Sequence, residues 1–107
     1  MIARIWHGYT TPENAGTYEH LLTSEIIPGI AAKRIPGYLN IQVLKRVVGQ
    51  EVEFTTIMWF DALESIQAFT GVDYEKAYVP ASARAVLSRF DERSIHCELR
   101  HESQSTQ

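Results

Sequence analysis

The sequence predicts an α+β fold with the element order β-α-β-β-α-β. Two kinds of periodicity support this class: apolar and polar residues alternate in four segments, as in strands, and apolar residues recur every three or four positions elsewhere, as in amphipathic helices. A chain of 107 residues has room for one domain with a modest core. We expect this domain to occupy residues 1–101 and a polar tail to occupy residues 102–107.

The first two predicted elements are a strand and a helix. Residues 2–9 alternate, which indicates a strand. Thr11 followed by Pro12 predicts a helix start, because threonine side chains cap helices and proline suits the first turn. Apolar residues at spacings of three and four continue to Ile30. Pro28 is expected to bend this helix near its end, because it removes a backbone hydrogen bond.

A predicted hairpin follows the first helix. The Pro-Gly pair at 36–37 ends the helical segment, and alternation then indicates a strand to about Val47. A turn at 48–50 leads into a third strand that ends at Phe60. These two strands are therefore expected to be neighbours in an antiparallel sheet.

A second helix and a last strand complete the order. Asp61 is expected to cap the helix, with Glu64 as its partner in a capping box. Pro80 opens a further helical piece, and residues 94–101 alternate again. The whole order is ferredoxin-like, so we predict a four-stranded antiparallel sheet with both helices on one face.

The two faces of the predicted sheet differ in composition. The helix-covered face is assigned to the apolar sets, which are Ala3, Ile5, Leu39, Ile41, Val43, Val52, Phe54, Met58, Ile95, Cys97 and Leu99. The opposite face carries Arg4, Tyr38 and both tryptophans, Trp6 and Trp59. These residue types are enriched in buried interfaces, so we expect a homodimer joined through the face that bears Trp6 and Trp59. The alternative is a solvated sheet with two incidental tryptophans.

Charge and cysteine content exclude several classes of function. Ten Lys and Arg against 13 Asp and Glu give a net charge of −3, so we expect no binding to nucleic acid or anionic lipid. Cys97 is the single cysteine, which excludes an internal disulfide and a multi-cysteine metal site. We expect a cytoplasmic protein, because the first residues lack the apolar region of a signal peptide and no apolar run is long enough to span a bilayer.

The same alternation along the strands predicts a mostly apolar and aromatic pocket between the helices and the sheet. His7 is the candidate catalytic residue, because it is a base on an otherwise apolar strand face. Its imidazole could deprotonate a phenol or an enol, and the resulting anion could pass an electron to oxygen. The alternative is a structural histidine at the sheet edge. The candidate substrate-binding residues are Tyr9, Tyr18, Phe60, Tyr74, Tyr78 and Arg84.

Several of these candidates also have simpler interpretations. Tyr74 and Tyr78, four residues apart, are more typical of a core with wet hydroxyls, and Arg84 is equally typical of a solvated helix residue. The remaining histidines, His20, His96 and His101, share no ligand spacing, so we predict no metal and no cofactor.

Parts of the sequence resemble the antibiotic-biosynthesis monooxygenase family. The element order, the opening Met-Ile-Ala-Arg-Ile-Trp and the run from Glu51 to Phe60 followed by a helix carry the resemblance, which covers about residues 1–101. It implies a dimeric α/β barrel whose protomers each hold substrate between helices and sheet. Characterised members oxidise aromatic polyketide-like compounds with O2 and without metal or flavin, and a related branch binds and degrades haem. The resemblance thus implies a cofactor-independent enzyme acting on an aromatic or enolisable small molecule.

The sequence departs from that family's pattern at its functional positions. The first-strand asparagine of the haem-degrading branch corresponds to a position near His7, and its tryptophan falls in 70–72, which contains none. Its haem ligand falls on Tyr78 or Val79. Three hypotheses follow: an oxidising enzyme, a non-catalytic binding or stress-related protein that uses the same pocket, and, less favoured, a protein that binds haem through Tyr78.

Overall fold

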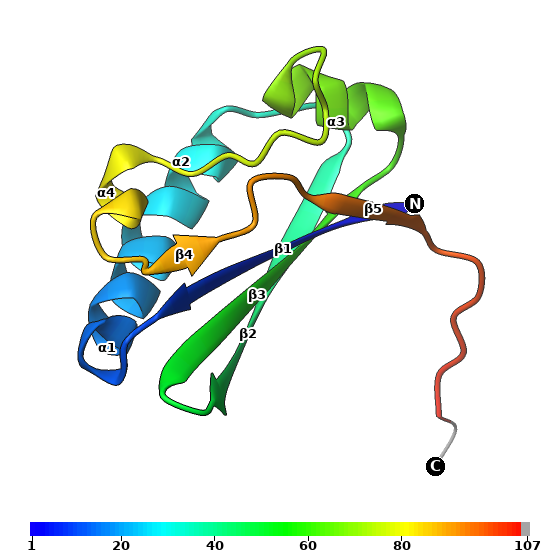
Figure 1. Ribbon diagram of the computed structural model, residues 1–107. Coiled ribbons are helices and arrows are strands. Elements are labelled where there is room, and N and C mark those ends of the chain that lie inside the picture. Colours follow the sequence, from blue (N-terminus) through cyan, green and yellow to red (C-terminus); the bar gives the residue numbers. More distant parts are fainter. Residues whose placement is uncertain (106–107) are drawn as a thin grey trace.

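A five-stranded antiparallel sheet forms the centre of the computed structural model, which describes residues 1–105 (Figure 1). The strands are β1 (Ile2–Thr10), β2 (Tyr38–Val48), β3 (Glu51–Phe60), β4 (Arg89–Phe90) and β5 (Ile95–Glu98). β3 lies between β2 and β1, and both β4 and β5 pair with the other edge of β1. This arrangement confirms the predicted α+β class and ferredoxin-like order.

The last predicted strand, residues 94–101, is shorter than expected, and a further short strand precedes it. β4 lies before the predicted strand, and β5 covers only the first half of it. Between them the backbone leaves β1 and bonds to the segment at 75–77 instead: the Ser94 N–H donates to the Glu75 carbonyl at 2.7 Å, and the Ala77 N–H donates to the Glu92 carbonyl at 3.0 Å. This exchange of partners accounts for five strands where four were expected.

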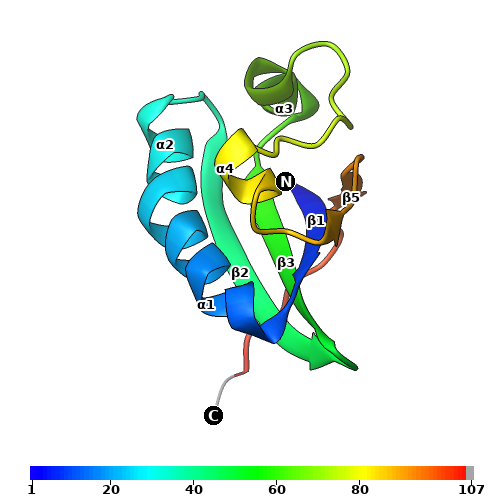
Figure 2. The ribbon, with the colours of Figure 1, turned by 60° about the vertical axis from the view of Figure 1, so that its left-hand side comes forward.

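One long helical stretch covers a face of the sheet (Figure 2). It consists of α1 (Pro12–Leu21), a π-helical turn η1 (Leu22–Ile26) and α2 (Ile27–Ala32). The Thr11 side chain caps α1 as predicted, accepting from the Asn14 N–H at 3.2 Å. The bend expected at Pro28 stays a prediction, and the structure has the π-helical turn η1 just before it, where the Ile27 N–H bonds to the Leu22 carbonyl five residues back.

Two shorter helices, α3 (Leu63–Thr70) and α4 (Ala81–Arg84), complete the cover. The predicted cap of α3 was wrong: Ala62 occupies the cap position, and no side chain caps the helix. The Asp61 carboxylate instead accepts from the Ser65 hydroxyl at 2.6 Å, while the Asp61 N–H donates to the Gly37 carbonyl at 2.9 Å. Asp61 therefore ties α3 to the turn that precedes β2.

The register between β1 and β3 decides which β1 side chains face the helices. Arg4 lies opposite Met58 and Trp6 lies opposite Thr56, and residues directly opposite in a sheet share a face. Arg4 is 3% exposed and Trp6 is 9% exposed, both on the helix side. The predicted orientation of β1 was therefore wrong, because alternation separates two faces without showing which of them the helices cover.

The same inversion holds for β5 and for the start of β2. Ile95 and Cys97 of β5 lie opposite Ile5 and Ala3 on the outer face of the sheet, the face without helices, and both are exposed. In β2 a bulge after Tyr38 brings its ring against the core. The consequence for the predicted interface is direct: Trp6 lies under the helices, whereas Trp59 is on the outer face, so the two tryptophans do not share a surface.

Two clusters of buried side chains form the core between the sheet and the helices. One is centred on Trp6, Tyr18 and Phe54, and the other on Phe60 and Ile66. Within residues 1–105, none of the helices combines the length and the apolar character needed to cross a membrane.

Candidate functional site

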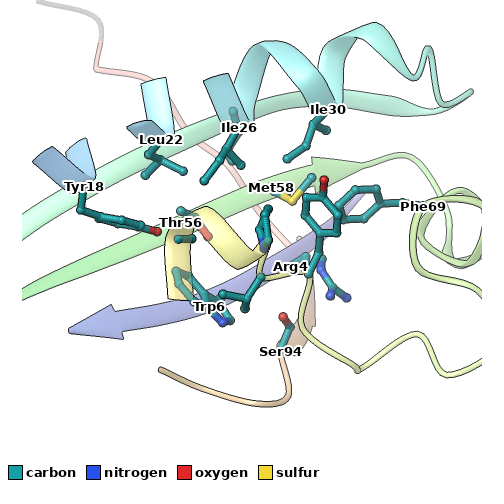
Figure 3. A pocket seen from close by; sticks show the side chains of 15 residues that line it. Arg4, Trp6, Tyr18, Leu22, Ile26, Ile30, Thr56, Met58, Phe69 and Ser94 are labelled. Carbon is teal, nitrogen blue, oxygen red and sulfur yellow. The ribbon is translucent and has the colours of Figure 1, made fainter. Parts of the chain in front are cut away.

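A cavity of about 40 Å³ lies between the long helical stretch and the sheet (Figure 3). Its polar lining comes from Arg4, Tyr18, Thr56, Tyr78 and Ser94. The rest of the lining is apolar or aromatic and consists of Trp6, Leu22, Ile26, Ile30, Ile41, Met58, Phe69, Val79, Pro80 and Ala83. The π-helical turn presents its first and last residues, Leu22 and Ile26, to this space.

The cavity is small for an aromatic ligand. A volume of about 40 Å³ holds roughly three water molecules, whereas a cavity that binds a benzene ring is about 150 Å³. Tyr78 is 45% exposed and packs edge to face on Phe69 at 5.3 Å between ring centroids. Both rings line the cavity, and Tyr78 is its partly exposed side chain that reaches the surface.

Trp6 forms a fixed wall of the cavity. Its indole Nε1 donates to the Asp91 carbonyl at 2.8 Å, which satisfies the polar edge of a ring that is otherwise buried. The six-membered part of the ring lies over Gly8, where a Cβ atom would stand 2.6 Å from Cη2 of Trp6. Glycine at this position therefore makes room for the indole on the helix side of β1.

Arg4 is the only charged residue in the lining, among the residues that the structure describes. Its Nη1 donates to the Tyr74 carbonyl and to Nε2 of His96, the latter at 2.9 Å, and its Nη2 donates to the Lys76 carbonyl at 2.8 Å. The guanidinium also lies 5.8 Å from the centre of the Phe69 ring. Burial lowers the pKa of Arg4 to about 10, so it stays protonated at neutral pH.

His96 supports this guanidinium from β5, directly opposite Arg4 in the sheet. Because arginine only donates, Nε2 of His96 must be the acceptor and Nδ1 must carry the proton. That Nδ1 is buried and has no hydrogen-bond partner among the described residues. Burial first, and then the charge of Arg4, lower the pKa of His96, so the ring is neutral at neutral pH.

Tyr18 contributes a buried phenol. The residue is 1% exposed and packs edge to face on Phe54 at 4.9 Å between ring centroids. Burial raises the pKa of Tyr18 to about 12, so its hydroxyl remains protonated and can act only as a hydrogen-bonding group at neutral pH. Thr56 and Ser94 are also buried and add two further hydroxyls.

Four of the residues predicted to bind substrate lie in or near the cavity. Tyr18 and Tyr78 line it. Phe60 is fully buried in the neighbouring core cluster, and the Tyr74 ring packs edge to face on His96 at 5.4 Å. Arg84 is not part of the lining: its Nε donates to the Val79 carbonyl at 2.9 Å, and its guanidinium lies over the Phe90 ring.

His7 and Tyr9 lie on the outer face instead, so their predicted position facing the helices was wrong. Nδ1 of His7 is 2.8 Å from Oδ2 of Asp91, and the Tyr9 hydroxyl donates to Glu53 at 3.0 Å. The pKa of Glu53 is lowered, first by its hydrogen bond from Arg46. The catalytic role of His7 stays a prediction that this cavity does not support.

The residues that the sequence placed on the wrong face are the most informative ones in the cavity, Arg4 and Trp6. A local signal was available in Gly8, because a glycine two positions from a tryptophan in one strand leaves space for the ring on that face. Residues 1–105 contain no group of three or more His, Cys, Asp or Glu side chains placed to hold a metal ion.

Comparisons with known proteins give matches in structure only. No family model and no curated protein matches the sequence. A candidate antibiotic biosynthesis monooxygenase from Bacillus cereus matches with a TM-score of 0.69 at 12% identity, over 100% of this chain and 98% of that one. A Streptomyces coelicolor monooxygenase from the gene ActVA-Orf6, solved with nanaomycin D, matches with a TM-score of 0.63 at 12% identity, over 98% and 92% of the two chains.

A third match is a variant of MhuD solved with two manganese protoporphyrin IX molecules in each active site. Its TM-score is 0.61 at 20% identity, over 98% of this chain and 100% of that one. Identities this low establish the fold without establishing substrate or activity. The chain therefore has, along nearly its whole length, the fold of the antibiotic-biosynthesis monooxygenases.

Proposed function

We propose that this protein is a small monooxygenase-like enzyme that binds an aromatic or enolisable molecule in the cavity and oxidises it with O2 without a cofactor. The observation that carries the proposal is the cavity itself, an apolar and aromatic space between the helices and the sheet. Its support comes from the fold, which is shared with a monooxygenase solved with a small-molecule ligand, nanaomycin D.

The proposed reaction requires the substrate as an electron-rich anion. A phenolate or enolate passes one electron to O2, and the two radicals combine into a carbon-bound peroxide. The peroxide takes up a proton and loses water to leave a quinone from the phenolate or a dicarbonyl compound from the enolate, so one oxygen atom of O2 enters the product and the other leaves as water. The rings of Trp6 and Tyr18 would hold the substrate in a space from which bulk water is excluded.

We also propose that two copies pair through the outer face of the sheet. Ile57, Ile5 and Ile95 lie side by side across β3, β1 and β5, and Trp59, Ala3 and Cys97 form the next row. Six adjacent residues of this kind form an apolar surface of the type that a second copy covers. The chain after β5 extends away from the sheet (Figure 1).

A second candidate function is non-catalytic binding of the same class of molecule. The observation that favours it is the composition of the lining, which contains no Asp, Glu, His, Lys or Cys within residues 1–105. Tyr18 is held as a neutral phenol, so the cavity presents no side-chain base that could remove a proton from a substrate.

Oxygen uptake distinguishes the two functions. We would measure O2 consumption with naphthols and dihydroxynaphthalenes and trace ¹⁸O2 into the product. Uptake with one labelled oxygen atom per product supports the enzyme. Saturable binding without uptake supports the binding protein, and a Soret shift of added haemin would instead favour haem binding.

Two alanines of α4 provide a matched pair of variants for this assay. Ala83 is 1% exposed and lines the cavity, whereas Ala81 is exposed on the same short helix. Ala83→Leu should reduce turnover by occupying the cavity, and Ala81→Leu should leave turnover unchanged. Equal turnover in the two variants would place the reaction outside this cavity.

A further inference from the structure

We infer that Arg4 is the anion-binding group of the cavity, and that the ligand is an apolar, ring-bearing monoanion whose charge is on oxygen: a phenolate, an enolate or a carboxylate. This inference rests on the proposed function for its site, and it adds the charge and chemical class of the molecule that the site takes.

The first argument is the missing counter-charge. Arg4 is 3% exposed, yet none of the described carboxylates forms an ion pair with it. More exposed arginines of the same chain are paired, such as Arg46 with Glu53 and Arg89 with Glu51. A buried charge is costly unless an opposite charge compensates it, so an unpaired guanidinium in a cavity wall is best explained by a ligand that brings the anion.

The second argument is the set of hydrogen bonds that Arg4 makes. Its three acceptors are the carbonyls of Tyr74 and Lys76 and the neutral imidazole of His96, none of which carries a full negative charge. They occupy three of the five N–H donors of a guanidinium, and Nε–H and one Nη2–H have no acceptor among the described residues. Two donors on one planar group match the oxygen atoms of a carboxylate or an enolate.

The third argument is the surroundings. Apart from a few hydroxyls, the lining next to Arg4 consists of Met58, Phe69 and other apolar side chains. An ion pair formed there has little water to screen it and is stronger than one at the surface. The cavity therefore selects a molecule that is apolar over most of its surface and anionic at one end (Figure 3).

This role also explains how a cavity without a base could prepare a substrate for oxidation. A phenol or enol that binds beside Arg4 becomes more acidic, because the anion is favoured by the adjacent positive charge. Its O–H bond breaks as the molecule enters the cavity, the proton passes to bulk water outside, and the anion remains paired with the guanidinium. Arg4 would then do by electrostatic stabilisation what a general base does by proton transfer.

The test is a binding experiment in the absence of O2. The chain has two tryptophans, so Trp59→Phe leaves Trp6 as a fluorescence reporter in the cavity wall. In this background 2-naphthoate should bind at least about tenfold more tightly than 2-naphthylmethanol, which has a similar shape and no charge. Arg4→Met should abolish that preference. Arg34→Met, which removes an exposed arginine outside the cavity lining, should retain it.

A second readout separates anion binding from a merely structural role of Arg4. Bound 2-naphthol should ionise at a pH at least about one unit lower than free 2-naphthol, as measured by its absorbance, and Arg4→Met should remove the shift. Methionine is apolar, so the variant is expected to fold, which circular dichroism checks. Binding of both naphthalene probes with equal affinity, or of neither, would overturn the inference.

The inference and the proposed function can fail separately. If the protein binds the charged probe selectively but consumes no O2 with any phenol, the proposed oxidation is wrong and the anion site is retained. If O2 uptake is unchanged in Arg4→Met and the two probes bind with equal affinity, the proposed oxidation is retained and the role of Arg4 is wrong.

Discussion

Arg4 of β1 and His96 of β5 lie directly opposite each other in the sheet and share a hydrogen bond of 2.9 Å. This contact joins a buried cation to a half-buried neutral ring, and it determines the tautomer of the histidine. It also makes the stability of the folded protein sensitive to pH.

The first prediction concerns that pH dependence. Burial and the charge of Arg4 lower the pKa of His96 from 6.5, so the unfolded chain binds this proton more readily than the folded protein. The contribution of neutral His96 to the stability of the fold is therefore complete above pH 6.5 and decreases as the pH falls below that value. Urea unfolding between about pH 7 and pH 5 should show a falling free energy of unfolding.

His96→Gln should flatten this pH profile, because an amide oxygen can still accept from Arg4 but does not titrate. His20→Gln removes an exposed histidine of α1 and should leave the profile unchanged. Carboxylates such as Glu53 change the free energy of unfolding only at lower pH, because the lowered pKa of Glu53 lies below 4.5. A profile that is unaltered in His96→Gln would contradict the explanation.

The second prediction concerns the Trp6 wall of the cavity. A Cβ atom at Gly8 would lie 2.6 Å from Cη2 of Trp6 and 3.2 Å from Cδ2 of Leu87. Gly8→Ala should therefore displace the indole and lower the free energy of unfolding by about 1–3 kcal/mol. The emission of Trp6 in the Trp59→Phe background should change as well. Gly16→Ala is the matched control: it has no atom within 4 Å and should be neutral or stabilising.

The third prediction concerns the turn before β2. Gly37 has a φ of 86°, and a Cβ atom there would lie 2.1 Å from both Oδ1 of Asp61 and Oγ of Ser65. Gly37→Ala therefore combines backbone strain with a clash in the contact that holds α3, and should destabilise the protein by about 2 kcal/mol or more. Thermal unfolding measures the loss. If Gly37→Ala unfolds at the wild-type temperature, this contact contributes little to stability.

The fourth prediction concerns the proposed pairing of two copies. Light scattering should give twice the mass of one chain at micromolar concentrations. Ile57→Lys places a charge in the centre of the apolar rows and should give a single-chain mass, since an unpaired lysine cannot be buried there. Leu63→Lys changes an exposed residue of α3 and should leave the mass unchanged. A wild-type protein with the mass of one chain would exclude the pairing.

Local structure was predictable from the sequence wherever neighbouring residues decide it. The cap at Thr11 and the hairpin between β2 and β3 both depend on residues close in the chain. The predicted cap at Asp61 was wrong because the Asp61 carboxylate accepts a hydrogen bond from the Ser65 hydroxyl instead of from the first turn of the helix backbone. The element order and the α+β class followed from the same local periodicities.

The sequence by itself determined that four segments alternate and that two amphipathic segments must cover a sheet. Only the tertiary structure decided which face of β1 they cover, because period-two alternation is symmetric and the choice depends on pairing with β3. That choice moved Arg4 and Trp6 into the cavity and His7 and Tyr9 out of it. The site therefore depends on the long-range pairing of β1 with β3, which no local pattern specifies.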